Sequence, residues 1–256
     1  MDCVPHHMID VADPAERFSA AKYAAMASQC VDDILARGRV PIVVGGTGLY
    51  IDALLRREEF AAAPGNSGVR ETLEAEYGAL GGEAFREKLA AVDPERAAKL
   101  APGDKKRLVR ALEVYRLTGE TITEHDERSK TLPPRYTSLK IALDFAARET
   151  LYERIDRRAA QMFENGLVDE VRALLAAGVS AETTAMQAIG YKETAAYLRG
   201  ECDLAQTVEC VQRESRRYAK RQLTWLRRDG SVQWLRWENA PDESAARRIA
   251  TAFSAR

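Results

Sequence analysis

Apolar residues recur at helical spacing over most of this 256-residue chain, whereas strand-like runs are short and few. Residues 19–37 predict a helix, because an apolar stripe recurs every three or four positions between Ser19, a suitable N-cap, and Gly38, a suitable stop. Residues 40–44 follow directly and are nearly all aliphatic, which is typical of a buried strand. The chain therefore opens with a helix and a strand.

Strand composition returns twice, at residues 139–145 and 232–237. Helical spacing fills most of the sequence between these two runs and returns after them. We expect helices at 148–176, 183–199, 203–227 and from Asp242 onward. This alternation predicts an α/β fold in which helices pack on a parallel sheet.

The segment between the first two predicted strands has a different character. Pro-Gly, Gly-Gly and Pro-Pro pairs interrupt it, and it shows helical spacing but no strand-like alternation. We interpret residues 57–134 as a helical insertion in an α/β core formed by residues 1–56 and 135–256.

Composition narrows the class of protein. Charged residues make up 30% and hydrophobic residues 46%, with a net charge of −1, which argues against disorder and against indiscriminate coating of nucleic acid. Basic residues nevertheless outnumber acidic ones over residues 203–237, so a local polyanion-binding surface is available. No apolar stretch has the length of a membrane span and no signal peptide is evident, so we expect no membrane association and a cytoplasmic location.

The cysteines and histidines give no sign of a metal centre. Four cysteines show no metal-ligand spacing, and we expect free thiols at Cys3, Cys30, Cys202 and Cys210. His6 and His7 precede Asp10, but adjacent side chains point apart and no third ligand is near. His125 lies in a polar stretch without the pattern of a Ser-His-Asp triad.

A glycine-rich turn, Gly45-Gly46-Thr47-Gly48, joins the first predicted strand to a helix. Such a turn lets the backbone approach a phosphate or nucleotide while the amides of the helix face the ligand. It matches neither the dinucleotide fingerprint nor a Walker A loop, since the chain contains no Gly-Lys pair. A tight turn without a ligand is the alternative.

Three groups of basic residues have spacings suited to phosphate. Arg154 and Arg158 are four residues apart and share a helical face, which suits a diphosphate, although a solvated face paired to Glu153 and Asp156 is the alternative. Residues 105–110 form a basic amphipathic helix that suits a nucleic-acid backbone, with a solvated face again as the alternative.

The third group lies on the last long helix. We expect Arg213, Arg217, Lys220 and Arg221 on one side, and Leu204, Val208, Val211, Tyr218 and Trp225 turned inward. Two separated basic helices fit an extended polyanion better than a small ligand.

Five blocks, in order, resemble the tRNA dimethylallyltransferase (tRNA isopentenyltransferase) family over almost the whole chain. The blocks are Val4-Pro5-His6-His7-Met8-Ile9-Asp10, Val44-Gly45-Gly46-Thr47-Gly48-Leu49-Tyr50, Lys106-Arg107-Leu108-Val109-Arg110-Ala111-Leu112-Glu113-Val114, Ala188-Ile189-Gly190-Tyr191-Lys192-Glu193 and Lys220-Arg221-Gln222-Leu223-Thr224-Trp225-Leu226-Arg227.

The resemblance implies a P-loop nucleotide-kinase-like α/β core with an inserted helical domain that binds the tRNA anticodon arm. It implies transfer of a dimethylallyl group from dimethylallyl diphosphate to N6 of the adenosine 3′ of the anticodon, with that base flipped into a channel. Mg²⁺ and basic residues would hold the leaving diphosphate. We expect tRNA and dimethylallyl diphosphate as partners, and a monomer.

The resemblance also assigns residues. Arg154 and Arg158 match positions that hold the diphosphate. Positions that contact tRNA match Thr47, Lys106, Arg107, Leu108, Val109, Arg110, Gln187, Gly190, Tyr191, Lys192, Lys220, Arg221, Gln222, Trp225 and Arg227.

One departure from the family is expected to matter. Members begin with a strand, a P-loop and an aspartate that acts as general base, and all three would lie upstream of Met1, so no catalytic residue is assigned here. We expect negligible transferase activity and exposed sheet edges in the chain as given. A noncatalytic tRNA-binding form and a small-molecule P-loop kinase are the alternatives. Retention of tRNA that falls steeply as salt rises would favour tRNA binding, whereas indifference to tRNA would favour the kinase.

Overall fold

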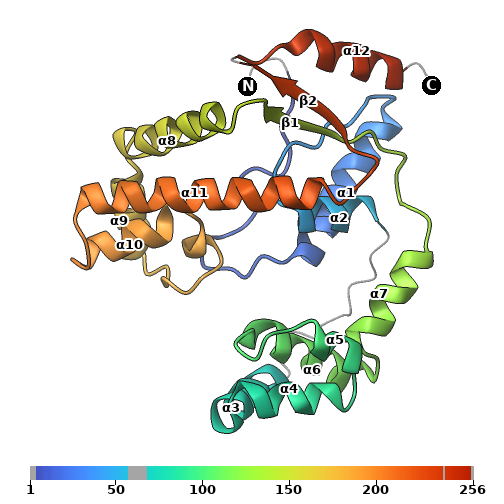
Figure 1. The fold of residues 1–256 in the computed structure, drawn as a ribbon, viewed down its shortest axis with the longest axis vertical. Coiled ribbons are helices and arrows are strands. Elements are labelled where there is room, and N and C mark those ends of the chain that lie inside the picture. Colours follow the sequence, from blue (N-terminus) through green and yellow to red (C-terminus); the bar gives the residue numbers. More distant parts are fainter. Residues whose placement is uncertain (1–3, 57–67, 239, 255–256) are drawn as a thin grey trace. The chain divides into compact units, whose positions relative to one another are not determined.

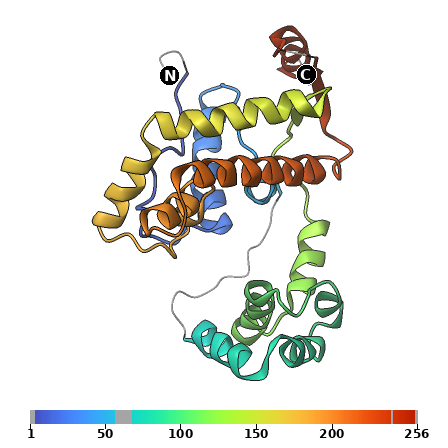
Figure 2. The same cartoon turned by 60° about the vertical axis from the view of Figure 1, so that its left-hand side comes forward.

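The chain divides into two compact units, which Figures 1 and 2 show from two directions. The computed structural model describes residues 4–56, 68–238 and 240–254. Unit 1 comprises Met1–Ile51 and Thr137–Arg256, and unit 2 comprises Asp52–Tyr136. The first expected boundary of the insertion, residue 57, and the expected free thiol of Cys3 lie outside the described residues.

Unit 1 contains two strands and most of the helices. The strands are β1 (Ile141–Phe145) and β2 (Gln233–Trp237). The helices are α1 (Ala20–Ala36), α2 (Gly48–Leu55), which starts in this unit, α8 (Arg148–Glu164), α9 (Leu167–Ala176), the short 3-10 helix η1 (Ala185–Gln187), α10 (Tyr191–Leu198), α11 (Leu204–Leu226) and α12 (Glu243–Ser254).

Strands β1 and β2 pair in parallel, in a register that runs from Ile141 opposite Gln233 to Phe145 opposite Trp237. A polar anchor fixes the start of the pair: the Nζ of Lys140 donates to Oδ2 of Asp229 at 2.6 Å. Hydrogen bonds from Lys140 and from the hydroxyl and amide of Ser231 hold the pKa of Asp229 well below its usual range. Two of the three predicted strands, and their parallel pairing, are confirmed.

The prediction of a third strand, at residues 40–44, is wrong. The segment is not paired with any strand in the described part of the chain, and the side chains of Ile42 and Val44 are 80% and 89% exposed. An aliphatic run is typical of a strand covered on both faces, but a strand also needs neighbours for its amides and carbonyls. Among the described residues, nothing supplies them here.

Glycines with positive φ end or start helices at positions that the spacing of apolar residues did not predict. The expected helix at 148–176 breaks into α8 and α9 at Gly166, where φ is +98°. The expected helix at 183–199 is interrupted at Gly190, where φ is +100°, so only α10 is α-helical. The first helix is confirmed as predicted, since the Oγ of Ser19 accepts from the amide of Lys22 and Gly38 has a φ of +66°.

Helices α8 and α11 lie side by side in unit 1 (Figure 1). Asp156 of α8 forms an ion pair with Arg216 of α11, and its carbonyl accepts from Nε2 of Gln212 at 3.2 Å. At one end of this pair, α9, η1 and α10 enclose an apolar cluster built on Val171 and Met186. These contacts fix α11, the longest helix of the chain, in its unit.

The described elements of unit 2 are all helices: α3 (Val69–Leu80), α4 (Gly82–Ala90), α5 (Pro94–Ala98), α6 (Lys105–Thr118) and α7 (Ile122–Thr131). Its core is an apolar cluster that includes Leu73, Phe85, Leu89, Leu108 and Leu112. The amphipathic pattern of α6 supplies the last two, as expected for a helix with one apolar face.

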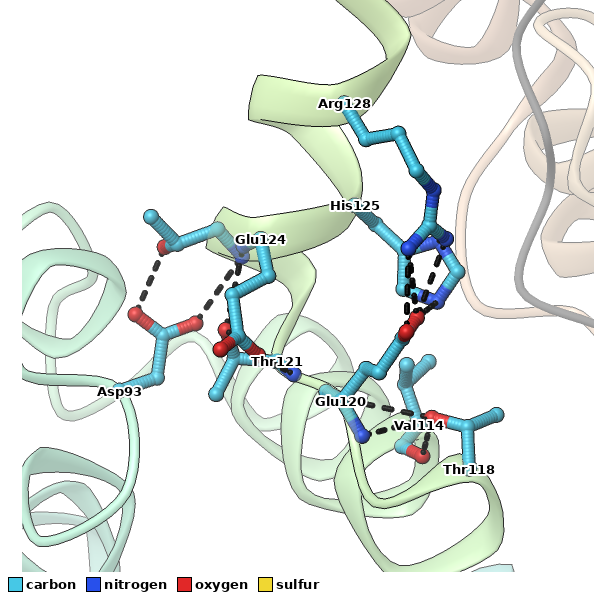
Figure 3. Close-up of polar contacts among 9 residues, drawn as sticks. Asp93, Val114, Thr118, Glu120, Thr121, Glu124, His125 and Arg128 are labelled. Carbon is cyan, nitrogen blue, oxygen red and sulfur yellow. Dashed lines mark hydrogen bonds and ion pairs between the residues drawn. The ribbon is translucent and has the colours of Figure 1, made fainter.

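Polar contacts join the short helices of this unit (Figure 3). The carboxylate of Asp93 is buried; it accepts from the amide of Arg96 at the start of α5, and from the hydroxyl and amide of Thr123 in α7. Glu120 accepts from Arg128 and lies 3.1 Å from Nε2 of His125. His125 therefore lies beside the ion pair of Glu120 and Arg128, with its Nδ1 2.9 Å from Nη2 of Arg128.

A buried carboxylate also joins α3 to α6. Glu113 is 5% exposed, and it accepts from Nε and Nη2 of Arg70 at 2.9 and 2.6 Å and from Nη1 of Arg110 at 2.7 Å. Burial alone would raise the pKa of Glu113, but the hydrogen bonds from Arg70 and Arg110 outweigh it and the pKa is lowered. The ionised form is the one that stabilises the unit.

We predict that Glu113→Gln lowers the free energy of unfolding of unit 2 by about 1–3 kcal/mol at neutral pH, measured by urea unfolding followed by circular dichroism. Because the pKa of Glu113 is lowered on folding, its stabilisation is present above the unfolded pKa of about 4.3 and fades as the pH falls below it. The difference between wild type and variant should therefore shrink at about pH 3. Glu83→Gln, which removes an exposed partner of Arg86, is the control; an equal loss in both variants would contradict the prediction.

Candidate functional site

The glycine-rich turn of unit 1 packs against one face of α11. A Cβ atom on Gly46 would lie 1.8 Å from Nε2 of Gln222, and one on Gly48 would lie 2.3 Å from the ring of Trp225. Between them, Oγ1 of Thr47 lies 3.3 Å from the hydroxyl of Tyr218. Positions 218, 222 and 225 share a helical face, so α11 occupies the space of a side chain at both glycines. The requirement for glycine is strict at Gly48, which meets the ring of Trp225, whereas Gly46 meets the far end of the flexible Gln222 side chain.

Local sequence fixes both partners of this contact. The carbonyl of Thr47 accepts from the amides of Tyr50 and Ile51, so α2 begins directly after the turn, as expected. Asp203 caps α11 through a reciprocal capping box with Gln206. The turn is thus held between the start of one helix and the side of another.

An aromatic contact positions α2 as well. The ring of Tyr50 stacks on that of Tyr23 in α1, with centroids 4.7 Å apart. Burial raises the pKa of both hydroxyls, and the neighbouring Tyr50 raises that of Tyr23 further. Both rings are therefore neutral at physiological pH.

The outer side of α11 is basic and exposed, at Arg213, Arg217, Lys220, Arg221 and Arg227. Arg213 and Arg217 share Glu214, whereas Lys220 has no ion-pair partner among the residues that the structure describes. The prediction that the apolar residues of α11 turn inward is confirmed for Val211, which is fully buried. It is wrong for Leu204, which is exposed near the helix start. A helix end has fewer neighbours to cover an apolar side chain.

Arg227 extends this basic surface to the sheet. Its Nη2 lies 3.9 Å from Oδ2 of Asp144, a buried carboxylate near the end of β1. Its guanidinium also lies 5.8 Å from the ring centroid of Trp234 in β2. The carboxyl end of a parallel strand is where open α/β sheets bind ligands.

The two arginines predicted to hold a diphosphate, Arg154 and Arg158, are both exposed on α8. Arg154 lies 5.2 Å over the ring of Phe145 at the end of β1. Asp156, the acid expected to neutralise them in the alternative interpretation, pairs with Arg216 of α11 instead. The guanidinium groups therefore keep donors available for an anion.

The residues around α10 that the resemblance assigns to tRNA contact are of two kinds, exposed side chains and residues that shape the helix start. Gln187 and Lys192 are exposed, and Gln187 donates to the carbonyl of Ala181. Gly190 is buried, and the hydroxyl of Tyr191 donates to Glu170. Burial, reinforced by Glu170, raises the pKa of Tyr191 to about 12. Gly190 and Tyr191 thus shape the start of α10, while the other two side chains are accessible.

The block on α6 divides in the same way. Lys106 and Arg107 are exposed, and Arg110 pairs with Glu113. Leu108 and Val109 are buried in the core of unit 2, so their side chains cannot contact tRNA as expected and instead hold the helix that carries the basic residues. A matching sequence block covers consecutive residues of a helix, so it includes buried residues as well as the exposed ones that can contact RNA.

No group of three His, Cys, Asp or Glu side chains within the described ranges could hold a metal ion. We derive no catalytic step through Mg²⁺, whose ligands by the family resemblance would include the substrate diphosphate. His6 uses its Nδ1 with the carbonyl of Val4 at 2.8 Å. Cys30, Cys202 and Cys210 carry free thiols, and no described helix is long and apolar enough to cross a membrane.

Sequence reasoning missed two residues of the site. Tyr218 was expected only as an inward-facing residue, yet its hydroxyl reaches Thr47. Its spacing to Gln222 and Trp225 is the signal that could have placed it on the same face. Asp144 is the other. It is a charged residue within an otherwise apolar strand, and that pattern is the signal that could have identified it, because a buried charge needs a partner.

We predict that Gly48→Ala destabilises unit 1 by about 1–3 kcal/mol, since the new methyl group must displace the ring of Trp225. Urea unfolding followed by tryptophan fluorescence measures this, because Trp225, Trp234 and Trp237 all belong to unit 1. Gly45→Ala is the matched control: its Cβ would meet no atom within 4 Å, so we expect a change within about 0.5 kcal/mol. Equal effects of the two substitutions would show that the close contact is not what requires glycine.

Comparison with known proteins identifies the family. The family described as IPP transferase matches residues 1–229. The chain is 42% identical over 236 residues to the tRNA dimethylallyltransferase of Thermoanaerobacter sp. (strain X514), covering 92% of this chain and 75% of that protein. It is 45% identical over 235 residues to that of Geobacter sulfurreducens, covering 91% and 75%.

Solved structures agree with this assignment. The fold is similar to that of the full-length tRNA isopentenylpyrophosphate transferase of Bacillus halodurans, with a TM-score of 0.69, 37% identity, and coverage of 100% of this chain and 79% of that one. It is also similar to a eukaryotic dimethylallyltransferase acting on tRNA, with a TM-score of 0.79, 25% identity, and coverage of 98% and 65%. The chain therefore belongs to the IPP transferase family.

Proposed function

We propose that this protein transfers a dimethylallyl group from dimethylallyl diphosphate to N6 of the adenosine 3′ of the anticodon in tRNA. The observation that carries the proposal is the packing of Thr47 and its flanking glycines against the basic helix α11, in a chain that belongs to the IPP transferase family. A close-packed turn beside exposed cationic side chains suits an RNA base flanked by phosphates.

In the same proposal, the fold is a P-loop nucleotide-kinase-like core with unit 2 as its inserted tRNA-binding domain. The similarity to solved transferases supports the core, and the exposed Lys106 and Arg107 support an RNA-binding role for α6. Basic residues on two different units suit an extended polyanion.

Each group of residues has a distinct task in this proposal. Thr47 contacts the target adenosine, which is flipped out of its stack. The tRNA backbone is held by Lys220 and Arg221 of α11 and by Arg227 at its C-cap, with Gln222 and Trp225 supporting the turn. Gln187 and Lys192 add polar contacts near α10. Contacts to phosphates position the RNA, and the contact to the base selects it.

Arg154 and Arg158 hold the diphosphate. In the reaction, the lone pair of N6 forms a bond to C1 of the dimethylallyl group, the C1–O bond breaks, and its electron pair leaves with the diphosphate. The guanidinium groups stabilise the negative charge that collects on the leaving oxygens. N6 loses one proton, and we assign no residue of this chain as the base. A magnesium requirement, a monomeric state and a cytoplasmic location stay predictions.

We predict that tRNA binding by this chain weakens steeply with salt, and that Lys220→Gln lowers the slope of log K against log[salt] by about 0.9, the value of one lost phosphate contact. Filter binding over a salt series measures it. Lys22→Gln is the control, because Lys22 lies on α1 and already pairs with Glu16. Binding that is indifferent to salt would contradict the tRNA proposal, and an equal change in the control would contradict the role of α11.

We predict that Arg154→Gln and Arg158→Gln each weaken binding of dimethylallyl diphosphate about tenfold or more, because each removes a charge-assisted donor pair. Isothermal titration calorimetry measures the affinity without requiring turnover. Arg172→Gln is the control, since Arg172 is exposed on another helix, α9, where it pairs with Asp169. If all three variants lose affinity equally, the effect is one of overall charge and the proposed pair is wrong.

A further inference from the structure

The hydroxyl of Tyr218 is the one polar group that the structure places beside Oγ1 of Thr47, at 3.3 Å, among the described residues. Thr47 is exposed, and Tyr218 is half-buried on α11. The two residues are 171 positions apart in the sequence, so only the packing of the turn on α11 brings them together. The inference below rests on the proposed contact between Thr47 and the target adenosine.

The surroundings of Thr47 hold its backbone in place. The glycines on either side of it are closed off by Gln222 and Trp225, and its carbonyl is committed to the start of α2. Its backbone is therefore held, its Oγ1 lies beside the Tyr218 hydroxyl, and the direction of its hydroxyl hydrogen depends on the partners of that oxygen. A threonine hydroxyl has one hydrogen and two acceptor positions, and the hydrogen rotates to suit its partners.

Tyr218 lies on an anchored helix and beside a cationic side chain. Helix α11 is anchored by the buried side chains of Val211 and Leu223, and the guanidinium of Arg221 lies 5.6 Å from the centroid of the Tyr218 ring. A tyrosine ring restrained in this way loses little further conformational entropy when its hydroxyl forms a hydrogen bond.

The chemistry decides the direction of the bond. A phenol is a stronger acid than an aliphatic alcohol, so in a pair of hydroxyls it is the better donor. When Tyr218 donates to Oγ1 of Thr47, an acceptor position of Thr47 is filled and its own hydrogen is directed elsewhere. Thr47 then serves as a donor, and a ring nitrogen of adenine is a matching acceptor.

We propose that Tyr218 is a positioning residue, which donates to Oγ1 of Thr47 and so orients the Thr47 hydroxyl as a donor toward the target adenine. Guanine differs from adenine at N1, which carries a hydrogen in guanine and is an acceptor in adenine. A Thr47 hydroxyl fixed as a donor therefore favours adenine over guanine, and Tyr218 contributes to that choice without touching the base.

The test compares two tRNAs that differ only at the nucleotide 3′ of the anticodon, adenosine or guanosine, in equilibrium binding to the full chain. The variants are Tyr218→Phe, which removes only the hydroxyl, Thr47→Val, and the double variant. We expect each single variant to reduce the preference for adenosine about five- to tenfold, the value of one hydrogen bond, and the double variant to lose no more than either.

Tyr197→Phe in α10 is the matched control, and we expect it to keep the full preference. Thermal unfolding of every variant separates this role from a merely structural one, because loss of packing would weaken binding of both tRNAs equally. If Thr47→Val loses the preference and Tyr218→Phe keeps it, the role of Tyr218 is overturned while the proposed function stands. If the wild-type chain shows no preference or does not bind tRNA, the proposed function itself fails, and this inference with it.

Discussion

The close approach of the glycine-rich turn to α11 is the constraint on which the candidate site depends. Two missing side chains, at Gly46 and Gly48, let Gln222 and Trp225 sit against the backbone. The same approach brings Thr47 within reach of Tyr218. Because a Cβ at Gly48 would overlap the ring of Trp225, a change on either side of this contact would move the other. The geometry of Thr47 thus depends on a helix whose sequence lies far along the chain.

Paired carboxylates play a structural part elsewhere in the molecule. Glu113, which is buried, and Asp156 and Asp229, which are half-buried, each join two elements, and each is matched by a basic partner from another element or from the loop before a strand. A paired charge of this kind contributes orientation as well as energy, since removal of either partner leaves the other without compensation.

Sequence patterns predicted the elements that depend on local signals. The cap at Ser19, the stop at Gly38, the start of α2 after the turn and the strands β1 and β2 all follow from neighbouring residues. Failures came where tertiary contacts decide. The run at 40–44 has strand composition but no neighbour within the described residues, and the left-handed conformation of Gly166 and Gly190 is invisible to helical periodicity. For the site, spacing identified the arginines of α8 and the basic side of α11, whereas the contact of Tyr218 with Thr47 requires the fold.

The shared carboxylate of Asp93 has a consequence for how unit 2 comes apart. Helix α7 contains no buried side chain, so little apolar surface secures it, and its start is held by the group that also caps α5. Loosening of either helix withdraws a hydrogen-bond partner from the other. The two should therefore fray together as one cooperative segment, while the apolar cluster around Leu73 and Phe85 stays closed. In unit 2, polar contacts would then hold the least stable part, α5 with α7, whereas apolar packing would hold the most stable part, the cluster around Leu73 and Phe85.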